Sequence, residues 1–127
     1  MNEIIKKKVL VVDDDKGTVL LLTKILTEKG FEVLKAYDGQ EALALIKQTI
    51  PDLIIIDRMM PKMDGIKACA LMKADKRFYK IPIVMITASA EKSDQELSAK
   101  IGVDAFLNKL LNAADVVGKV EILINRV

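Results

Sequence analysis

Histidine is absent from the 127-residue chain, and only one cysteine, Cys69, is present. The lack of histidine excludes Ser-His-Asp and Cys-His catalysis and most zinc chemistry. A single cysteine cannot form an internal disulfide or a Cys-x-x-Cys pair, and we expect Cys69 to be a small apolar residue on a helix face. Any chemistry must therefore come from carboxylates, hydroxyls or amines.

Long hydrophobic runs and a strong net charge are also missing. The apolar runs are far shorter than the roughly 20 residues of a membrane-crossing helix, and no signal-peptide segment precedes the first of them. We therefore expect a cytoplasmic protein with no membrane partner. A net charge of +2 is too small to indicate a nucleic-acid footprint, so we expect no direct nucleic-acid binding by this chain. Its length and its 51% of hydrophobic residues predict one domain over residues 1–127.

Five short runs rich in valine, isoleucine and leucine alternate with five segments of helical length. The runs are mostly continuous, which is typical of parallel strands covered on both faces. This order predicts an α/β fold of the flavodoxin-like (βα)5 type, a doubly wound five-stranded parallel sheet in order 2-1-3-4-5 with helices on both faces. The expected strands are 8–12, 32–36, 53–56, 81–86 and 103–107. Of the five expected helices, the first ends at Gly30, the second ends before Pro51, and the other three span 66–74, 94–101 and 113–125.

Asp57 closes the apolar run 53–56. A carboxylate at the end of a buried strand is costly to desolvate, so it requires a charge partner, a metal or a chemical task. Other strands also end in polar residues, and the carboxyl ends of parallel strands meet at one edge of the sheet. We expect these side chains to converge there: Asp13, Asp14, Asp57, Thr87 and Lys109.

The chemistry of such a set is restricted. Neighbouring carboxylates raise one another's pKa values and need a divalent cation to stay ionised together. Oxygen ligands suit Mg²⁺ or Mn²⁺ rather than zinc. A hydroxyl and an ammonium can hold phosphoryl oxygens, and aspartate is a competent phosphoryl acceptor. The set therefore predicts a carboxylate that becomes phosphorylated.

Four motifs in this order resemble the receiver domains of two-component response regulators: VLVVDDD at 9–15, PDLIIIDRMMPKMDG at 51–65, IPIVMITA at 81–88 and GVDAFLNK at 102–109. The resemblance implies that Asp57 accepts a phosphoryl group from a sensor histidine kinase or phosphotransfer protein. It implies a regulator that promotes only its own phosphorylation and dephosphorylation, rather than an enzyme. Further implied roles are Mg²⁺ (or Mn²⁺) binding by Asp13, Asp14, Asp57 and the backbone carbonyl of Met59, phosphate binding by Thr87 and Lys109, and an aromatic switch at Phe106.

The resemblance also implies that phosphorylation changes a surface formed by the fourth helix, the fifth strand and the fifth helix, about residues 93–125. The downstream effector is not identified by the sequence. We expect a monomer or a weak phosphorylation-dependent dimer.

Leu110 is a departure from the family, which usually has proline after the lysine with a cis bond between them. A cis bond before leucine costs about 3 to 4 kcal/mol. We therefore predict a trans Lys109–Leu110 bond or a rearranged loop. Either one puts in question whether the ammonium of Lys109 is directed at the phosphoryl group.

Met59 and Ser89 lie two residues after Asp57 and Thr87 and flank the path of a water in line with the phosphorus. Neither side chain is a carboxylate or carboxamide. We expect slow self-dephosphorylation, on the order of minutes or longer. After Asp57, Asp64-Gly65 predicts a turn into a helix, with Gly65 tolerating a positive φ.

Two alternatives stay open. A haloacid-dehalogenase-type phosphatase would use Asp13 as nucleophile and Asp15 as general acid, although it leaves Asp57 unexplained. Against this reading, we expect Asp15 to be a helix N-cap or an exposed acid. The second alternative is a receiver-like scaffold that binds partners without phosphorylation.

Overall fold

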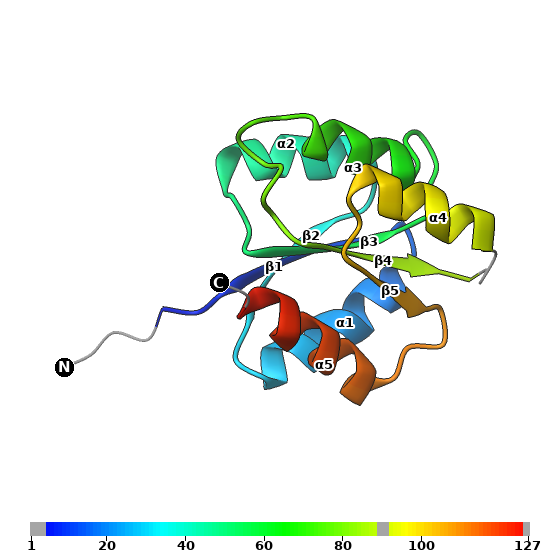
Figure 1. Cartoon of the computed structure of the whole chain (residues 1–127). Coiled ribbons are helices and arrows are strands. Elements are labelled where there is room, and N and C mark those ends of the chain that lie inside the picture. The colour runs from blue at the N-terminus through cyan, green and yellow to red at the C-terminus, as the bar shows by residue number, and fades with distance from the viewer. Residues whose placement is uncertain (1–4, 89–91, 126–127) are drawn as a thin grey trace.

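The computed structural model describes residues 5–88 and 92–125 (Figure 1). Strands and helices alternate along these residues. None of the helices there has the length and hydrophobicity that a membrane crossing requires. The elements are β1 (Lys8–Val12), α1 (Lys16–Glu28), β2 (Glu32–Ala36), α2 (Gly39–Gln48), β3 (Leu53–Asp57), α3 (Gly65–Lys73), β4 (Ile83–Thr87), α4 (Lys92–Ile101), β5 (Ala105–Asn108) and α5 (Ala113–Ile124).

The five strands form one parallel sheet in the order β2-β1-β3-β4-β5. β1 and β3 are adjacent although a strand and two helices separate them in the chain. Their carboxyl ends are the switch point at which ligands bind in open α/β sheets. The predicted fold class and strand order are confirmed.

Two hydrophobic cores lie on opposite faces of the sheet. Figure 1 shows α2, α3 and α4 over one face and α1 and α5 over the other. Alternate residues of each strand point to opposite faces, so Ile54 and Ile56 enter one core while Leu53 and Ile55 enter the other. Residues of α2 and α3 fill the first core, beside α4, and residues of α1 and α5 fill the second. Burial on both faces explains why the strands are continuous apolar runs in the sequence. Cys69 is buried in the first core, as expected of a small apolar residue.

Two strands begin later than predicted. β4 begins at Ile83 rather than at residue 81, because Pro82 has no N–H to donate to the sheet. β5 begins at Ala105 rather than at residue 103, because the N–H of Val103 donates to the carbonyl of Ser98 at the end of α4. Both shifts come from local hydrogen bonding that the apolar pattern does not carry.

The amino-terminal edge of the sheet is held by Lys73 at the end of α3. Its Nζ donates to the carbonyls of Tyr79 at 3.0 Å and Ile81 at 2.8 Å and lies 3.8 Å from the carboxylate of Asp104. The carboxylate of Asp104 also accepts a hydrogen bond from the N–H of Ile83 at 2.8 Å. One lysine and one aspartate therefore join α3, the start of β4 and the residue before β5.

Candidate functional site

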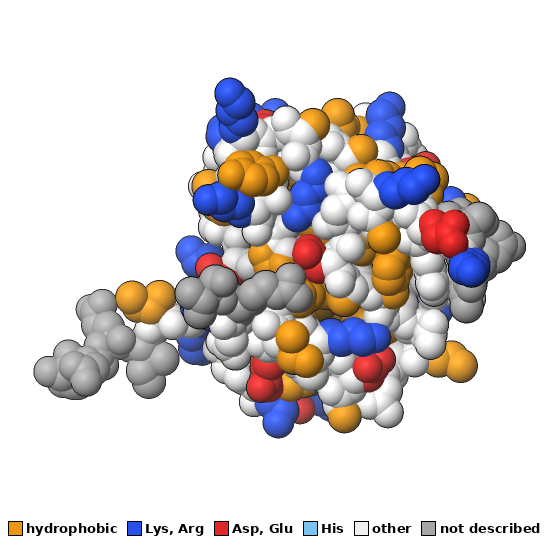
Figure 2. Space-filling model, in the orientation of Figure 1, with side chains coloured by type: hydrophobic (Ala, Val, Ile, Leu, Met, Phe, Trp, Pro, Cys, Tyr) orange, Lys and Arg blue, Asp and Glu red, His pale blue; other side chains and the backbone are white. Residues whose placement is uncertain are grey.

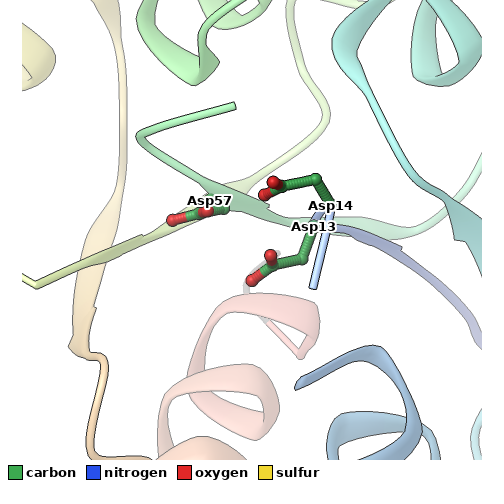
Figure 3. Close-up of side chains that lie close together, drawn as sticks. All are labelled: Asp13, Asp14 and Asp57. Atoms are coloured by element: carbon green, nitrogen blue, oxygen red, sulfur yellow. The ribbon is translucent and has the colours of Figure 1, made fainter. Parts of the chain in front are cut away.

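Three aspartates gather where β1 and β3 end (Figure 3). Asp13 and Asp14 follow β1 directly, and Asp57 is the last residue of β3. One carboxylate oxygen from each residue lies within 4.8 Å of the other two. Asp13 and Asp57 are buried, whereas Asp14 is exposed. The cluster thus combines two carboxylates withdrawn from water with one that faces solvent.

Lys109, which follows β5, neutralises part of this negative charge. Its Nζ lies 3.1 Å from Oδ2 of Asp57 and 3.4 Å from Oδ2 of Asp13. Partial burial opposes the charged ammonium, but the hydrogen bonds and charges of the two aspartates outweigh it and raise the pKa of Lys109. The ammonium is therefore charged at neutral pH and shared between two carboxylates.

Asp13 is the carboxylate of the cluster whose ionised form is disfavoured by its surroundings. Burial, with a further contribution from the charge of Asp57, raises its pKa from 3.8 to about 6. The N–H of Asp15, 2.9 Å from Oδ1 of Asp13, and the ammonium of Lys109 act in the opposite direction but do not compensate. The neighbouring positive charge and hydrogen-bond donor thus do not fully stabilise the ionised form of this buried carboxylate. A divalent cation would do so, which makes Asp13 a suitable ligand for one.

Asp15 has a different task from its two neighbours. It is the N-cap of α1, and its carboxylate accepts hydrogen bonds from the N–H of Gly17 at 3.0 Å and the hydroxyl of Thr18 at 2.9 Å. The hydrogen bond from Thr18, followed by that from Gly17, lowers the pKa of Asp15. The expected N-cap is confirmed. A carboxylic acid held ionised in this way is poorly suited to act as a general acid.

Thr87 and Phe106 lie on the two strands beyond β3. Thr87 is the last residue of β4 and is buried, and its backbone carbonyl accepts a hydrogen bond from the N–H of Lys109 at 3.1 Å. Phe106 is half-buried against the core that α2 and α3 fill, and its carbonyl accepts a hydrogen bond from Nζ of Lys119 on α5. The carboxyl edge of the sheet therefore brings Thr87 and Lys109 together, while Phe106 lies further back on β5.

The Lys109–Leu110 bond is trans, as predicted, because no cis peptide bond occurs among the described residues. Leu110 itself is 95% exposed. The trans bond does not keep Lys109 away from Asp57, because its Nζ lies 3.1 Å from Oδ2 of that residue. The fifth strand and the hydrogen bond to Thr87 thus direct Lys109 to the site without a cis bond.

The loop between β3 and α3 packs closely against Asp57. A Cβ added at Gly65 would lie 2.2 Å from the backbone oxygen of Asp57, whereas its φ is not positive. The expected tolerance of a positive φ is therefore not what this position uses, and close packing against the loop explains the glycine instead. Asp64 caps α3 by accepting from the N–H of Lys67 at 2.8 Å, which confirms the predicted turn into a helix.

Sequence reasoning missed two features of this loop, both at Lys62. Lys62 has a φ of 67°, and its Nζ lies 3.6 Å from the carboxylate of Asp38, the N-cap of α2. No pattern around Lys62 distinguishes it from an ordinary surface lysine. The side chain of Met59 in the same loop is exposed, and Ser89 lies outside the described residues.

Comparison with known proteins identifies one family. The family described as "Response regulator receiver domain" matches residues 9–121. PhoP of Bacillus subtilis, an alkaline phosphatase synthesis transcriptional regulatory protein, is 38% identical over 120 residues, which are 94% of this chain and 49% of PhoP. The DNA-binding response regulator MtrA of Mycobacterium leprae is 34% identical over 95% of this chain and 52% of MtrA. The chain therefore spans about half the length of these curated relatives.

Solved structures agree with this result. A putative response regulator from Chloroflexus aurantiacus J-10-fl is 30% identical, with a TM-score of 0.92 over 96% of this chain and 100% of that one. The Mn²⁺-bound form of response regulator Rcp1 is 28% identical, with a TM-score of 0.84 over 95% of this chain and 96% of that one. The phosphorylated cyanobacterial phytochrome response regulator RcpA is 29% identical, with a TM-score of 0.85 and the same coverage.

The relatives overturn one expectation. We expected no nucleic-acid binding partly from the net charge of +2, yet PhoP is a transcriptional regulatory protein and MtrA is DNA-binding. Net charge summed over 127 residues is a poor guide to what proteins of twice this length bind. The expectation is therefore wrong for the family to which these relatives belong.

The fold, the acidic cluster at the ends of β1 and β3, and the match over residues 9–121 agree with one another. The structural relatives extend this agreement across 95–96% of the chain. This chain belongs to the receiver domain family of the response regulators of two-component signal transduction.

Proposed function

We propose that residues 1–127 act as one receiver domain in which Asp57 accepts a phosphoryl group from the phosphohistidine of a sensor kinase or phosphotransfer protein. The observation that carries this proposal is the position of Asp57. Its buried carboxylate lies within 4.8 Å of oxygens from two other aspartates and 3.1 Å from an ammonium. Such a carboxylate has both a cation site and a counter-charge beside it, which are the requirements for receiving a phosphoryl group.

Asp13, Asp14 and Asp57, with the backbone carbonyl of Met59, would hold Mg²⁺ or Mn²⁺. Three hard oxygen donors and the raised pKa of Asp13 fit such an ion. When bound, the ion supplies positive charge that draws the phosphoryl oxygens towards the site and offsets their repulsion by the carboxylates. The Mn²⁺-bound form of the relative Rcp1 supports this choice of metal.

The transfer is a displacement at phosphorus. One oxygen of Asp57 forms a new O–P bond while the P–N bond to the donor histidine breaks, and the electron pair of that bond stays on the imidazole nitrogen. Lys109 then loses its contact with a carboxylate oxygen and pairs with a phosphoryl oxygen. The hydroxyl of Thr87 donates to another. The phosphorylated relative RcpA supports the modification.

The signal would leave through α4, β5 and α5. Phosphorylation would draw Thr87 towards the phosphoryl group, and Phe106 would turn inward. Figure 2 shows the face formed by these elements, on which hydrophobic side chains lie between charged ones. Leu97 on α4 and Ile122 on α5 are among the exposed apolar residues, and Lys119 pairs with Asp115 at 3.7 Å. A mixed surface of this kind suits an effector that binds only one of two states.

The test is phosphorylation by a small donor. Wild type, Asp57→Asn and Asp52→Asn are incubated with acetyl phosphate and Mg²⁺, and the mass of the intact protein is followed. Asp52 is the matched control, because its exposed carboxylate lies just before the start of β3, whose last residue is Asp57, and accepts a hydrogen bond from the N–H of Lys8 at 2.7 Å. We expect wild type and Asp52→Asn to gain one phosphoryl group and Asp57→Asn to gain none. Equal gain in all three, or none in wild type, would refute the proposal and favour a scaffold that does not use phosphorylation.

A further inference from the structure

Met59 is far more exposed than the other methionines of the described chain. Its residue is 68% exposed, whereas Met72 and Met85 are 1% and 0% exposed. Met60 and Met63 are half-buried against the core that α2 and α3 fill. Oxidation of a methionine by a hydroperoxide requires access to its sulfur, so Met59 is the described methionine that reacts most readily.

Met59 lies close in sequence to Asp57, and a hydrogen-bond donor lies beside its sulfur. The residue stands two positions after Asp57, at the start of the loop that leads from β3 to α3. Its Sδ lies 3.0 Å from Nη1 of Arg58. A thioether is a weak acceptor, but a sulfoxide oxygen is a strong one, and a guanidinium donor is already beside the sulfur. A sulfoxide at this position therefore has a partner available beside the phosphorylation site.

We propose that Met59 is a modification site at which hydroperoxides shorten the lifetime of the phosphorylated state. This inference rests on the proposed function, in which Asp57 carries an acyl phosphate. A lone pair of the sulfur attacks one oxygen of the hydroperoxide, the O–O bond breaks and an S–O bond forms. The other oxygen leaves with the electron pair and takes up the proton, giving water or an alcohol. The sulfur is oxidised by two electrons and the hydroperoxide is reduced by two.

The lifetime changes because hydrolysis of the acyl phosphate requires an oriented water. The water attacks phosphorus in line with the bond to Asp57, that bond breaks, and the carboxylate leaves with its electron pair. The thioether of Met59 accepts hydrogen bonds too weakly to hold this water. The sulfoxide oxygen accepts a hydrogen bond from this water. The hydrogen bond orients the water so that one of its own lone pairs points at phosphorus. If Met59 flanks the water path, as its place two residues after Asp57 predicts, oxidation turns an apolar side chain on that path into a polar one.

The experiment separates oxidation from its effect. Purified protein is treated with hydrogen peroxide, freed of it, and digested for peptide mass analysis to locate the added oxygen. Parallel samples are phosphorylated with acetyl phosphate and Mg²⁺, freed of the donor, and followed by intact mass. We expect the oxygen at Met59 first and loss of the phosphoryl group at least about threefold faster than in untreated protein. Methionine sulfoxide reductases should restore the slower rate.

Variants of two methionines in the same loop provide the controls. Met59→Leu should lose its phosphoryl group at the same rate with and without peroxide, and Met63→Leu should respond as wild type does. Met59→Gln, whose carboxamide oxygen imitates the sulfoxide, should be fast without peroxide. Oxidation of Met60 or Met63 before Met59, or an unchanged rate after oxidation of Met59, would overturn the inference. Failure of untreated wild type to gain a phosphoryl group would instead overturn the proposed function, and this inference with it.

Discussion

Replacement of Asp13 by asparagine should stabilise the metal-free protein at neutral pH. Burial and Asp57 raise the pKa of Asp13 from 3.8 to about 6. At about 1.4 kcal/mol per pKa unit, ionised Asp13 destabilises the folded state by up to about 3 kcal/mol. Asparagine removes the charge and keeps an oxygen that can accept from the N–H of Asp15. The variant loses the ion pair with Lys109 at 3.4 Å, but Lys109 keeps its contact with Asp57 at 3.1 Å. We therefore expect the free energy of unfolding to rise by about 1 to 3 kcal/mol.

The pH dependence identifies the cause of the gain. Between pH about 4 and 6 the folded wild type binds more protons at Asp13 than the unfolded chain does, so its stability falls as the pH rises through this window. Below it Asp13 is protonated in both states and the penalty disappears. Urea unfolding in the presence of a chelator should therefore show a large difference between Asp13→Asn and wild type at pH 7 and a small one at pH 4. Mg²⁺ should stabilise wild type more than the variant.

Asp15→Asn is the matched control for this experiment. Asp15 lies two residues away, but its hydrogen bonds from Thr18 and Gly17 lower its pKa, so its charge favours folding instead of opposing it. Asparagine is also a good N-cap. We expect no stabilisation of Asp15→Asn at pH 7. The reasoning is refuted if Asp13→Asn is no more stable than wild type at pH 7, or if its advantage is the same at pH 4.

Two further predictions concern the loop after Asp57 and the ammonium of the site. Gly65→Ala should lower the free energy of unfolding by about 1 to 3 kcal/mol in denaturant titrations, since its Cβ would lie 2.2 Å from the oxygen of Asp57. Gly118→Ala in α5, where a Cβ meets nothing within 4 Å, should raise it by up to about 1 kcal/mol, and equal effects would contradict this contrast. Lys109→Gln should bind Mn²⁺ several-fold more tightly in calorimetric titrations, because it removes a positive charge 3.1 Å from an oxygen of Asp57. Weaker binding would show that Lys109 orders the carboxylates.

Much of this architecture was predictable because parallel strands buried on both faces leave continuous apolar runs. Leu53 to Ile56 is such a run, and the structure places its residues alternately in the two cores. The convergence of Asp13, Asp14 and Asp57 was predictable for a related reason, since strand ends meet at one edge of the sheet. These features depend on local pattern and on general rules of topology.

Other features depend on contacts between distant segments and were not predictable. The need for glycine at position 65 comes from its distance to the backbone of Asp57, which only the folded loop defines. The sharing of Lys109 between Asp57 and Asp13 is similar, because the sequence could place the ammonium at the edge but not between two oxygens. The ion pair of Lys62 with Asp38 joins two loops that no periodic pattern relates.

For a receiver domain in which, as we propose, phosphorylation moves Thr87, the contacts of Lys73 have a mechanical consequence. Its bonds to Tyr79, Ile81 and Asp104 tie α3 to the starts of β4 and β5, at the edge of the sheet opposite Asp57. Because these contacts hold that edge, we expect that the proposed movement of Thr87 at the other end would not be taken up by the strands sliding as a whole. The displacement would instead appear as bending near the carboxyl ends of the strands. In this way Lys73, although remote from the phosphorylation site, would confine the movement to the carboxyl edge of the sheet.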